Sequence, residues 1–134
     1  MMIEDAIAQR VLAATPIVAL IGDAFTWGAR LPALPALQAS IVADTRPERF
    51  GGPVLLRETI VQFDAWADDA AVGRALREAV IAALTPAAVV GEIAFRRGFV
   101  VAIRASGLLT REERAIDPEL SRQSIDIKFW HLVQ

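Results

Sequence analysis

Residues 55–66 read LLRETIVQFDAW and form the most strand-like stretch of the chain. Within it, side chains suited to a core alternate with polar ones. The first set is Thr59, Val61, Phe63 and Ala65, and the second is Glu58, Gln62 and Asp64. Successive side chains of a strand point to opposite faces of a sheet, so this alternation predicts a strand with one face on the core and the other face toward solvent.

A second strand is predicted just before this one. Residues 37–46 are also strand-like, and the intervening PERFGGP (47–53) is dense in proline and glycine. These residue types form turns, so the two strands are predicted to make one long hairpin. Phe50 lies at its tip, where little core is available to bury an aromatic ring, and this position favours contact with a partner.

Two helices are predicted, one on each side of the hairpin in the sequence. In residues 3–14 apolar side chains recur at helical spacing and acids occupy the first turn, which the helix dipole favours. Asp68 or Asp69 caps the second helix, and Thr85-Pro86 ends it. Its apolar stripe is Val72, Leu76, Val80 and Ala83 or Leu84. Residues 17–21 are expected to add a short turn, and residues 24–29 a short strand.

Two more strands complete the pattern, at residues 99–105 and 124–133. In the last one Ile125, Ile127 and Phe129 alternate with polar side chains. The polar segment 107–118 between them predicts an exposed loop or short arm. No repeat or linker divides the chain. The order of elements therefore predicts one α+β domain over residues 1–134, with a mostly antiparallel sheet, two helices packed on one face and a long β-hairpin extension.

The composition restricts the classes of function. The chain is 54% hydrophobic, more than one small core needs, yet its longest apolar runs are short and are broken by Pro16 and Pro86, so no membrane-spanning helix is predicted. Its acidic start does not fit a secretory signal, so it is expected to stay in the cytoplasm. A net charge of −2 provides no general basic field for nucleic acid, and zero cysteines exclude thiol chemistry. The apolar excess favours contacts with other proteins.

No motif for phosphate, dinucleotide, zinc-protease or hydrolase chemistry occurs, so no catalytic residue, cofactor or metal is predicted. Two weaker arrangements stay open. His131, the single histidine, could act as a general base, with Ser40 or Ser124 as nucleophile and Asp64 or Asp126 as the orienting acid. If their strands are neighbours, the two aspartates could also bind a divalent ion. The alternative is that both aspartates lie on a solvated sheet face, with Lys128 as compensating charge.

Interaction residues are predicted at three kinds of position: the hairpin tip, the strand ends that carry tryptophan, and the charged segment within 107–118. Trp66 and Trp130 either plug the core or anchor a partner, and alternating charges in the polar segment could fix the register between subunits. The residues are Arg49, Phe50, Trp66, Arg111, Glu112, Glu113, Arg114 and Trp130.

Several segments together resemble a known family. VQFDAWA (61–67) is followed by an alanine-rich helix containing REAV (77–80), and SIDIKFWH (124–131) lies near the end of the chain. The N-terminal helix leads to ALIGD (19–23) and then to a proline-containing connector. In this order they resemble the tail-completion or tail-terminator proteins of long-tailed phages and gene-transfer-agent particles. The likeness covers most of the chain, and the 107–118 segment departs from it.

The resemblance implies a structural role without catalytic residues or cofactors. Such proteins form a ring, typically of six copies, on the end of the tail tube, stop its polymerisation and present a surface to the head-side connector. DNA passes through the lumen without sequence recognition. The implied location is the neck or tail end of a virion or phage-like particle, assembled in the bacterial cytoplasm. Two alternatives remain: another neck component, such as a stopper, and a small α+β enzyme or ligand-binding domain.

Overall fold

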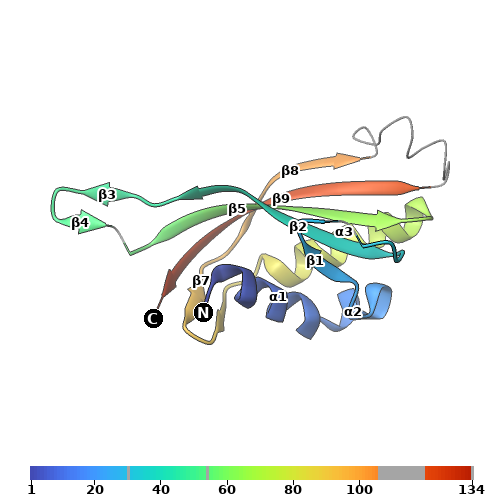
Figure 1. Cartoon of the computed structure of the whole chain (residues 1–134), viewed down its shortest axis with the longest axis horizontal. Coiled ribbons are helices and arrows are strands. Elements are labelled where there is room, and N and C mark those ends of the chain that lie inside the picture. Colours follow the sequence, from blue (N-terminus) through green and yellow to red (C-terminus); the bar gives the residue numbers. More distant parts are fainter. Residues whose placement is uncertain (30, 54, 106–119, 134) are drawn as a thin grey trace.

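The computed structural model describes residues 1–29, 31–53, 55–105 and 120–133. Within these ranges three helices and nine strands follow one another along the chain (Figure 1). They are α1 (Ile3–Ala13), α2 (Thr15–Ile21), β1 (Phe25–Trp27), β2 (Ala36–Thr45), β3 (Glu48–Arg49), β4 (Gly52–Pro53), β5 (Arg57–Ala67), α3 (Ala70–Leu84), β6 (Ala88–Val90), β7 (Ile93–Phe95), β8 (Phe99–Ala105) and β9 (Ser121–Val133). The α+β class predicted from the sequence is confirmed.

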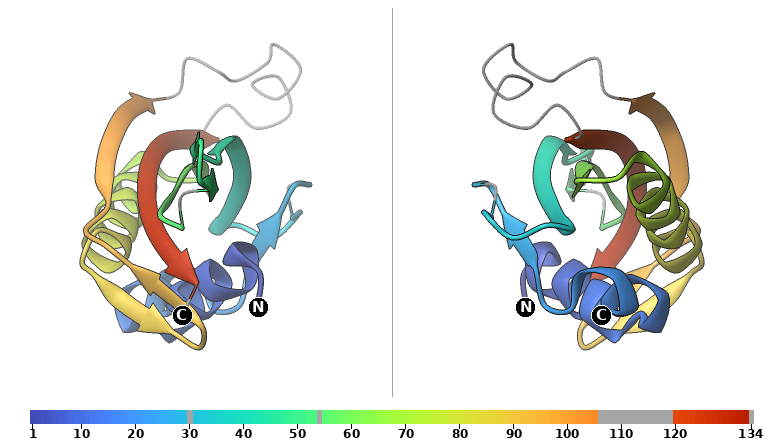
Figure 2. Two further views of the ribbon diagram at one scale, coloured as in Figure 1. Left: turned by 90° about the vertical axis from the view of Figure 1, so that its left-hand side faces the viewer. Right: turned by 90° about the vertical axis from the view of Figure 1, so that its right-hand side faces the viewer.

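The sheet is built around β5, the stretch with the clearest alternation. Its order is β1-β2-β5-β9-β7-β6, and β8 also pairs with β9, next to the segment that β7 pairs with. All pairs are antiparallel except β1 with β2. The sheet is strongly curled when viewed along its length (Figure 2). The long β2–β5–β9 ladder is therefore the platform on which the other elements lie.

All three helices cover one face of this sheet (Figure 1). The core side chains of β5 and β9 point toward them, and Phe63, Ile127 and Phe129 are fully buried. α3 contributes Leu76, Val80 and Leu84, spaced four residues apart as an amphipathic helix requires, and these too are fully buried. The alternation and the helical periodicity seen in the sequence thus describe the two sides of the same core.

The predicted boundaries of α3 are correct, and the chemistry at its start is visible. Asp69 is the N-cap, and its carboxylate accepts hydrogen bonds from the backbone N–H groups of Ala71 (2.7 Å) and Val72 (3.3 Å). At the other end, Arg10 of α1 donates to the carbonyl oxygens of Ala83 (3.2 Å) and Pro86 (2.8 Å). These bonds fasten α1 to the C-terminal end of α3.

Several elements differ from the prediction. Residues 17–21 belong to a separate helix, α2, because Pro16 ends the first helix but is compatible with the first turn of the next. β6 and β7, which the sequence did not indicate, form a short hairpin around Gly91, whose φ of +54° suits glycine. β9 begins at Ser121, three residues before the predicted start. The predicted arm at 107–118 lies outside the described residues.

The predicted hairpin extension is also present. β2 and β5 run beyond the helices, and the short β3–β4 pair continues them into an arm with Phe50 at its turn (Figure 1). No helix within the described ranges is long and apolar enough to cross a membrane.

Candidate interaction surface

A polar cluster lies on the sheet face that points away from the helices. Cross-strand partners share a face, and here Gln62 lies opposite Asp126, and Asp64 opposite Ser124. Side chains of four strands interact in this cluster. Its members are Gln38, Gln62, Asp64, Arg104, Arg122, Ser124 and Asp126.

Asp64 is the most deeply buried acid of the polar cluster. It is only 2% exposed, which corrects the expectation that it lies on a solvated face. Its carboxylate accepts hydrogen bonds from Ser124 Oγ (2.5 Å) and Gln62 Nε2 (3.2 Å), and it forms an ion pair with Arg122 Nη2 at 3.0 Å. A buried charge needs such partners, because removing it from water without them is costly.

Asp126 is paired separately, with Arg104. The guanidinium donates to both carboxylate oxygens, at 3.0 and 3.1 Å, and this hydrogen bonding raises the pKa of Arg104 above its usual value. Each aspartate thus has its own arginine, which leaves neither carboxylate poised for a divalent cation. Across the described ranges no group of three or more histidine, cysteine or acidic side chains is arranged to hold a metal ion. Lys128 pairs with Glu58 at 3.2 Å instead of compensating these aspartates.

Trp66 and Trp130, both predicted to be interaction residues, occupy different environments on this same face of the sheet. Trp66 is 4% exposed, its indole N–H donates to Gln38 Oε1 at 3.0 Å, and Arg122 lies over its ring at 5.0 Å. Trp66 therefore contributes to the packing around the polar cluster. Trp130 is half-buried and lies opposite Glu58 on the neighbouring strand.

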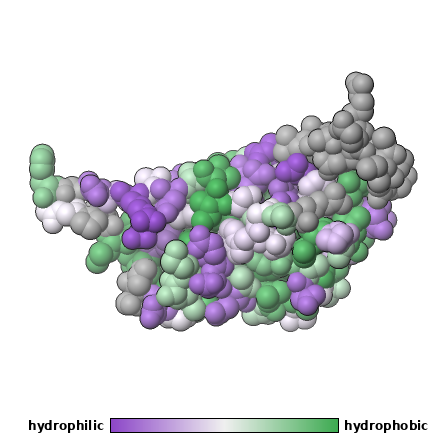
Figure 3. Space-filling model, in the orientation of Figure 1, coloured by the Kyte–Doolittle hydropathy of each residue, from purple (hydrophilic) through white to green (hydrophobic). Residues whose placement is uncertain are grey.

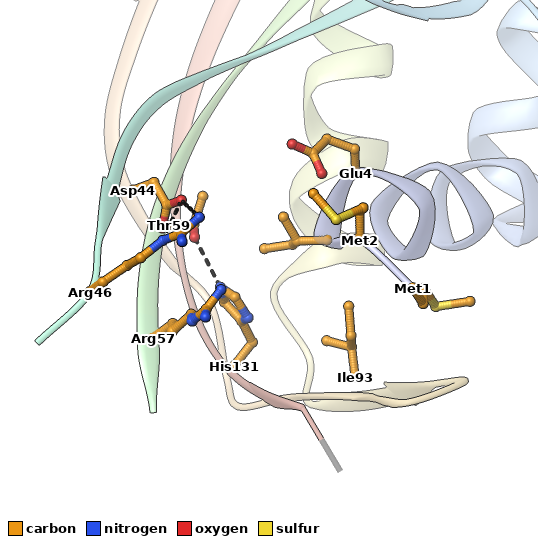
Figure 4. A pocket seen from close by; sticks show the side chains of 10 residues that line it. Met1, Met2, Glu4, Asp44, Arg46, Arg57, Thr59, Ile93 and His131 are labelled. Carbon is orange, nitrogen blue, oxygen red and sulfur yellow. Dashed lines mark hydrogen bonds and ion pairs between the residues drawn. The ribbon is translucent and has the colours of Figure 1, made fainter. Parts of the chain in front are cut away.

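His131 lies on the other face of the sheet, beside a small cavity of about 90 Å³ (Figure 4). Its Nε2 is 2.9 Å from Thr59 Oγ1, while Nδ1 is buried without a hydrogen-bond partner among the described residues. Ser124 and both aspartates project from the opposite face, and so does Ser40, which lies across from Gln62. The structure therefore does not bring together the catalytic triad that the sequence left open.

Burial and the nearby Arg57 both lower the pKa of His131 below its usual value of 6.5, with burial as the larger cause, whereas Asp44 acts in the opposite direction. In acid the folded chain then binds fewer protons than the unfolded chain. We therefore expect the free energy of unfolding to fall as the pH drops below about 6.5, the pKa of the unfolded state, and to go on falling until the pH reaches the lower pKa of the folded state. Thermal unfolding between pH 7.5 and 5 should show this decline.

His131→Gln is the matched control for this pH dependence, since glutamine can bond to Thr59 but does not titrate. Its unfolding temperature should vary less over the same pH range. Because His131 is the single histidine, no other side chain has an ordinary pKa in this window. An equal decline in the variant would exclude His131 as its cause.

The tip of the arm is the most exposed apolar site. Phe50 has an exposed fraction of 114%, and Leu55, near the start of β5, has 77%. Figure 3 shows hydrophobic surface at the tip of the arm and a second hydrophobic area near the middle of the molecule. Neither side chain adds to the monomer core. The predicted partner-contact role of Phe50 thus has an accessible side chain to support it.

No protein-family model matches the sequence, and no curated protein matches it either. Its structure is similar to a chain in the solved structure of the virion of a native gene transfer agent particle. The TM-score is 0.65, and the match covers 96% of this chain and 93% of that one at 15% sequence identity. The two chains share a fold over almost their whole lengths.

The remaining predicted interaction residues lie either in the arm or outside the described part of the chain. Arg49 lies in β3, next to Phe50, so its backbone is part of the exposed arm. Arg111, Glu112, Glu113 and Arg114 lie outside the described residues. Two exposed apolar strand edges, in β2 and β8, were not predicted. Both stretches were predicted to be strands, and the apolar side chains of 41–42 and 99–103 were a visible signal.

Proposed function

We propose that this chain is a structural component of a phage-like particle. The observation that carries the proposal is the fold likeness to a chain of a gene transfer agent virion, because it extends over nearly all of both chains. A local motif shared by unrelated proteins would not extend so far. Within the described residues, the side chains that could have formed a hydrolytic site are separated by the sheet.

More specifically, we propose the role of a tail terminator. Several copies would form a ring, of six if the chain follows the family it resembles, on the end of the tail tube. The ring would stop polymerisation of the major tail tube protein and join the tail to the head-side connector or stopper. The order of segments along the chain and the exposed arm support this role, because a neck protein must contact both neighbours and its own copies.

The charge of the chain is compatible with DNA in the lumen of the ring. A net charge of −2 gives no overall positive field, and strong neutralisation of phosphates would hold DNA that has to slide. The terminator role implies a location at the neck or tail end of the particle, with assembly in the bacterial cytoplasm before the head and tail join.

Negative-stain electron microscopy of the purified chain, alone and with its tail tube protein, tests this proposal. We expect rings, and tubes capped at one end whose length stops increasing. A chain that stays monomeric in both conditions would overturn the proposal. A ring that binds the connector but leaves tube growth unchanged would instead indicate another neck component.

Phe50→Ser is the variant that tests the arm within the same assay. Because the ring of Phe50 is fully exposed, we expect no change in the unfolding temperature of the monomer. Attachment to the tube or to a neighbouring copy should weaken. Val89→Ser is the matched control, since Val89 is 63% exposed but lies in β6, away from the arm. Equal losses in both variants would show that the arm has no special role.

A further inference from the structure

Two long edges of the curled sheet, besides the short outer strands β1 and β6, have no described strand beside them. β8 pairs with β9 on one side and with no described strand on its other side. β1 covers β2 only along residues 37–39, so the outer side of residues 40–45 has no strand partner in the described part of the chain. The two free edges lie on opposite sides of the sheet (Figure 2).

Both free edges carry exposed apolar side chains. In β8 the exposed fractions are 54% for Phe99, 53% for Val101 and 47% for Ile103. In β2 they are 37% for Ile41 and 56% for Val42. Unpaired backbone groups beside apolar side chains form a template for pairing with another strand, and proteins usually protect such edges with charge or cover them. These two edges are therefore suited to a partner.

We infer that the occupant of each edge is a second copy of this chain: β8 of one copy pairs with residues 40–45 of β2 in the next. The inference deepens the proposed ring, on which it rests. Strand direction agrees with it. β2, β5, β9 and β8 alternate in direction, so β8 and the β2 of a following copy are antiparallel when the sheet continues across the boundary.

One register satisfies both strands. Placing Ile103 opposite Ile41 pairs residues 99–104 with 45–40, which is the part of β2 that β1 leaves free. Ile103 lies across from Ile125 and Ile41 across from Val61 within the subunit, so both side chains lie on the helix-facing side. Directly opposed residues in a ladder must share a face, and here they do.

The irregular positions fit the same register. The ladder of β8 is shifted between Val100 and Ala102, and that of β2 between Ile41 and Ala43, so the two bulges fall opposite each other. Beyond β2 and β8, the register brings the exposed Arg96 toward the exposed Glu48, and neither has an ion-pair partner among the described residues. Opposite charges at this position favour one alignment over its neighbours.

The contact uses two different surfaces, so it is heterologous, and repetition of such a contact closes a ring when the rotation between copies allows it. A self-pairing of β8 would instead produce a dimer and leave the β2 edge open. The inference therefore predicts which residues of two copies meet, which the ring proposal alone does not.

Engineered cysteines provide the test, because the natural chain contains none. Ile41→Cys and Ile103→Cys are purified separately, mixed and oxidised at a concentration at which the wild-type chain forms rings. We expect a shift from monomer to covalent dimer on a non-reducing gel for the mixture, and no shift for either variant alone. A chain with both substitutions should give a ladder of oligomers.

Val100→Cys is the matched control for the register. Val100 is 37% exposed and shares a face with Ile103, but across the bulge it lies two ladder positions away, about 7 Å along the strand. Together with the spacing of about 4.8 Å between neighbouring strands, this offset exceeds the Cα–Cα reach of a disulfide, so the mixture of Val100→Cys with Ile41→Cys should stay monomeric. Equal cross-linking of this mixture would overturn the register, and a dimer of Ile103→Cys alone would overturn the heterologous contact.

Microscopy of the reduced variants separates this inference from the ring proposal. Rings without any cross-link in the mixture would overturn the edge pairing and leave the terminator role standing. A wild-type chain that forms no rings, together with a mixture that forms no cross-link, would overturn both. Ile103→Lys tests the edge pairing without cross-linking. It should abolish rings with no shift in the monomer unfolding temperature, because its side chain is already half exposed. Intact rings in this variant would contradict the pairing.

Discussion

Replacing Asp64 with alanine should lower the free energy of unfolding by about 3–5 kcal/mol, the range for removing one partner of a buried ion pair. The side chain of Asp64 is 3% exposed and that of Arg122 is 19% exposed, so water screens this pair little. The substitution removes the acceptor of three donors, from Ser124, Gln62 and Arg122. Urea unfolding of the monomer measures the loss.

Asp126→Ala is the control, because it removes an aspartate from the same sheet face in a more exposed pair. Arg104 is 39% exposed and Asp126 is 15% exposed, so the expected loss is only about 1 kcal/mol, near that of surface pairs. Asp64→Asn, which keeps an acceptor for Ser124, should fall between the two. Similar losses for Asp64→Ala and Asp126→Ala would show that the burial of Asp64 does not govern its contribution.

The burial of Asp64 also shows where sequence patterns stop being informative. Alternation in residues 55–66 correctly predicted that Phe63 faces the core and that Asp64 does not. Alternation cannot say what the second face meets. The curl of the sheet and the pairing of β9 with both β5 and β8 bring two arginines onto that face, and these depend on contacts between distant residues. A local pattern does not contain them.

The same distinction applies to the other elements. Helix α3 was predicted well because its N-cap, its apolar stripe and the proline that ends it are all local features of the sequence, and Asp69 caps it as expected. The short strands β6 and β7 were missed, because three-residue strands have no periodicity of their own and exist by pairing with each other and with β9. For the interaction surface, the exposed tip at Phe50 was predictable from turn residues. The free edges were not, since an edge is defined by strand order.

Replacing Phe129 with alanine should also cost about 3–5 kcal/mol of unfolding free energy, the range for truncating a large buried aromatic side chain. Phe129 is fully buried and lies between two other rings, with centroid distances of 6.3 Å to Phe63 and 5.7 Å to Phe95. Both contacts are edge-to-face, a favourable geometry for aromatic pairs. Because these rings belong to β5, β7 and β9, the cavity left by the substitution would loosen three strands together.

Phe50→Ala is the control, since it makes the same chemical change at a fully exposed ring and should leave the unfolding free energy within about 0.5 kcal/mol of wild type. Both variants are compared by urea unfolding at a concentration where the chain is monomeric, because assembly would add stability by mass action. Phe129→Ala should also lose rings on warming before the wild type does, as the edges that pair are held by the same sheet. If Phe129→Ala matched Phe50→Ala in stability, the aromatic core would not be what holds β5, β7 and β9 together.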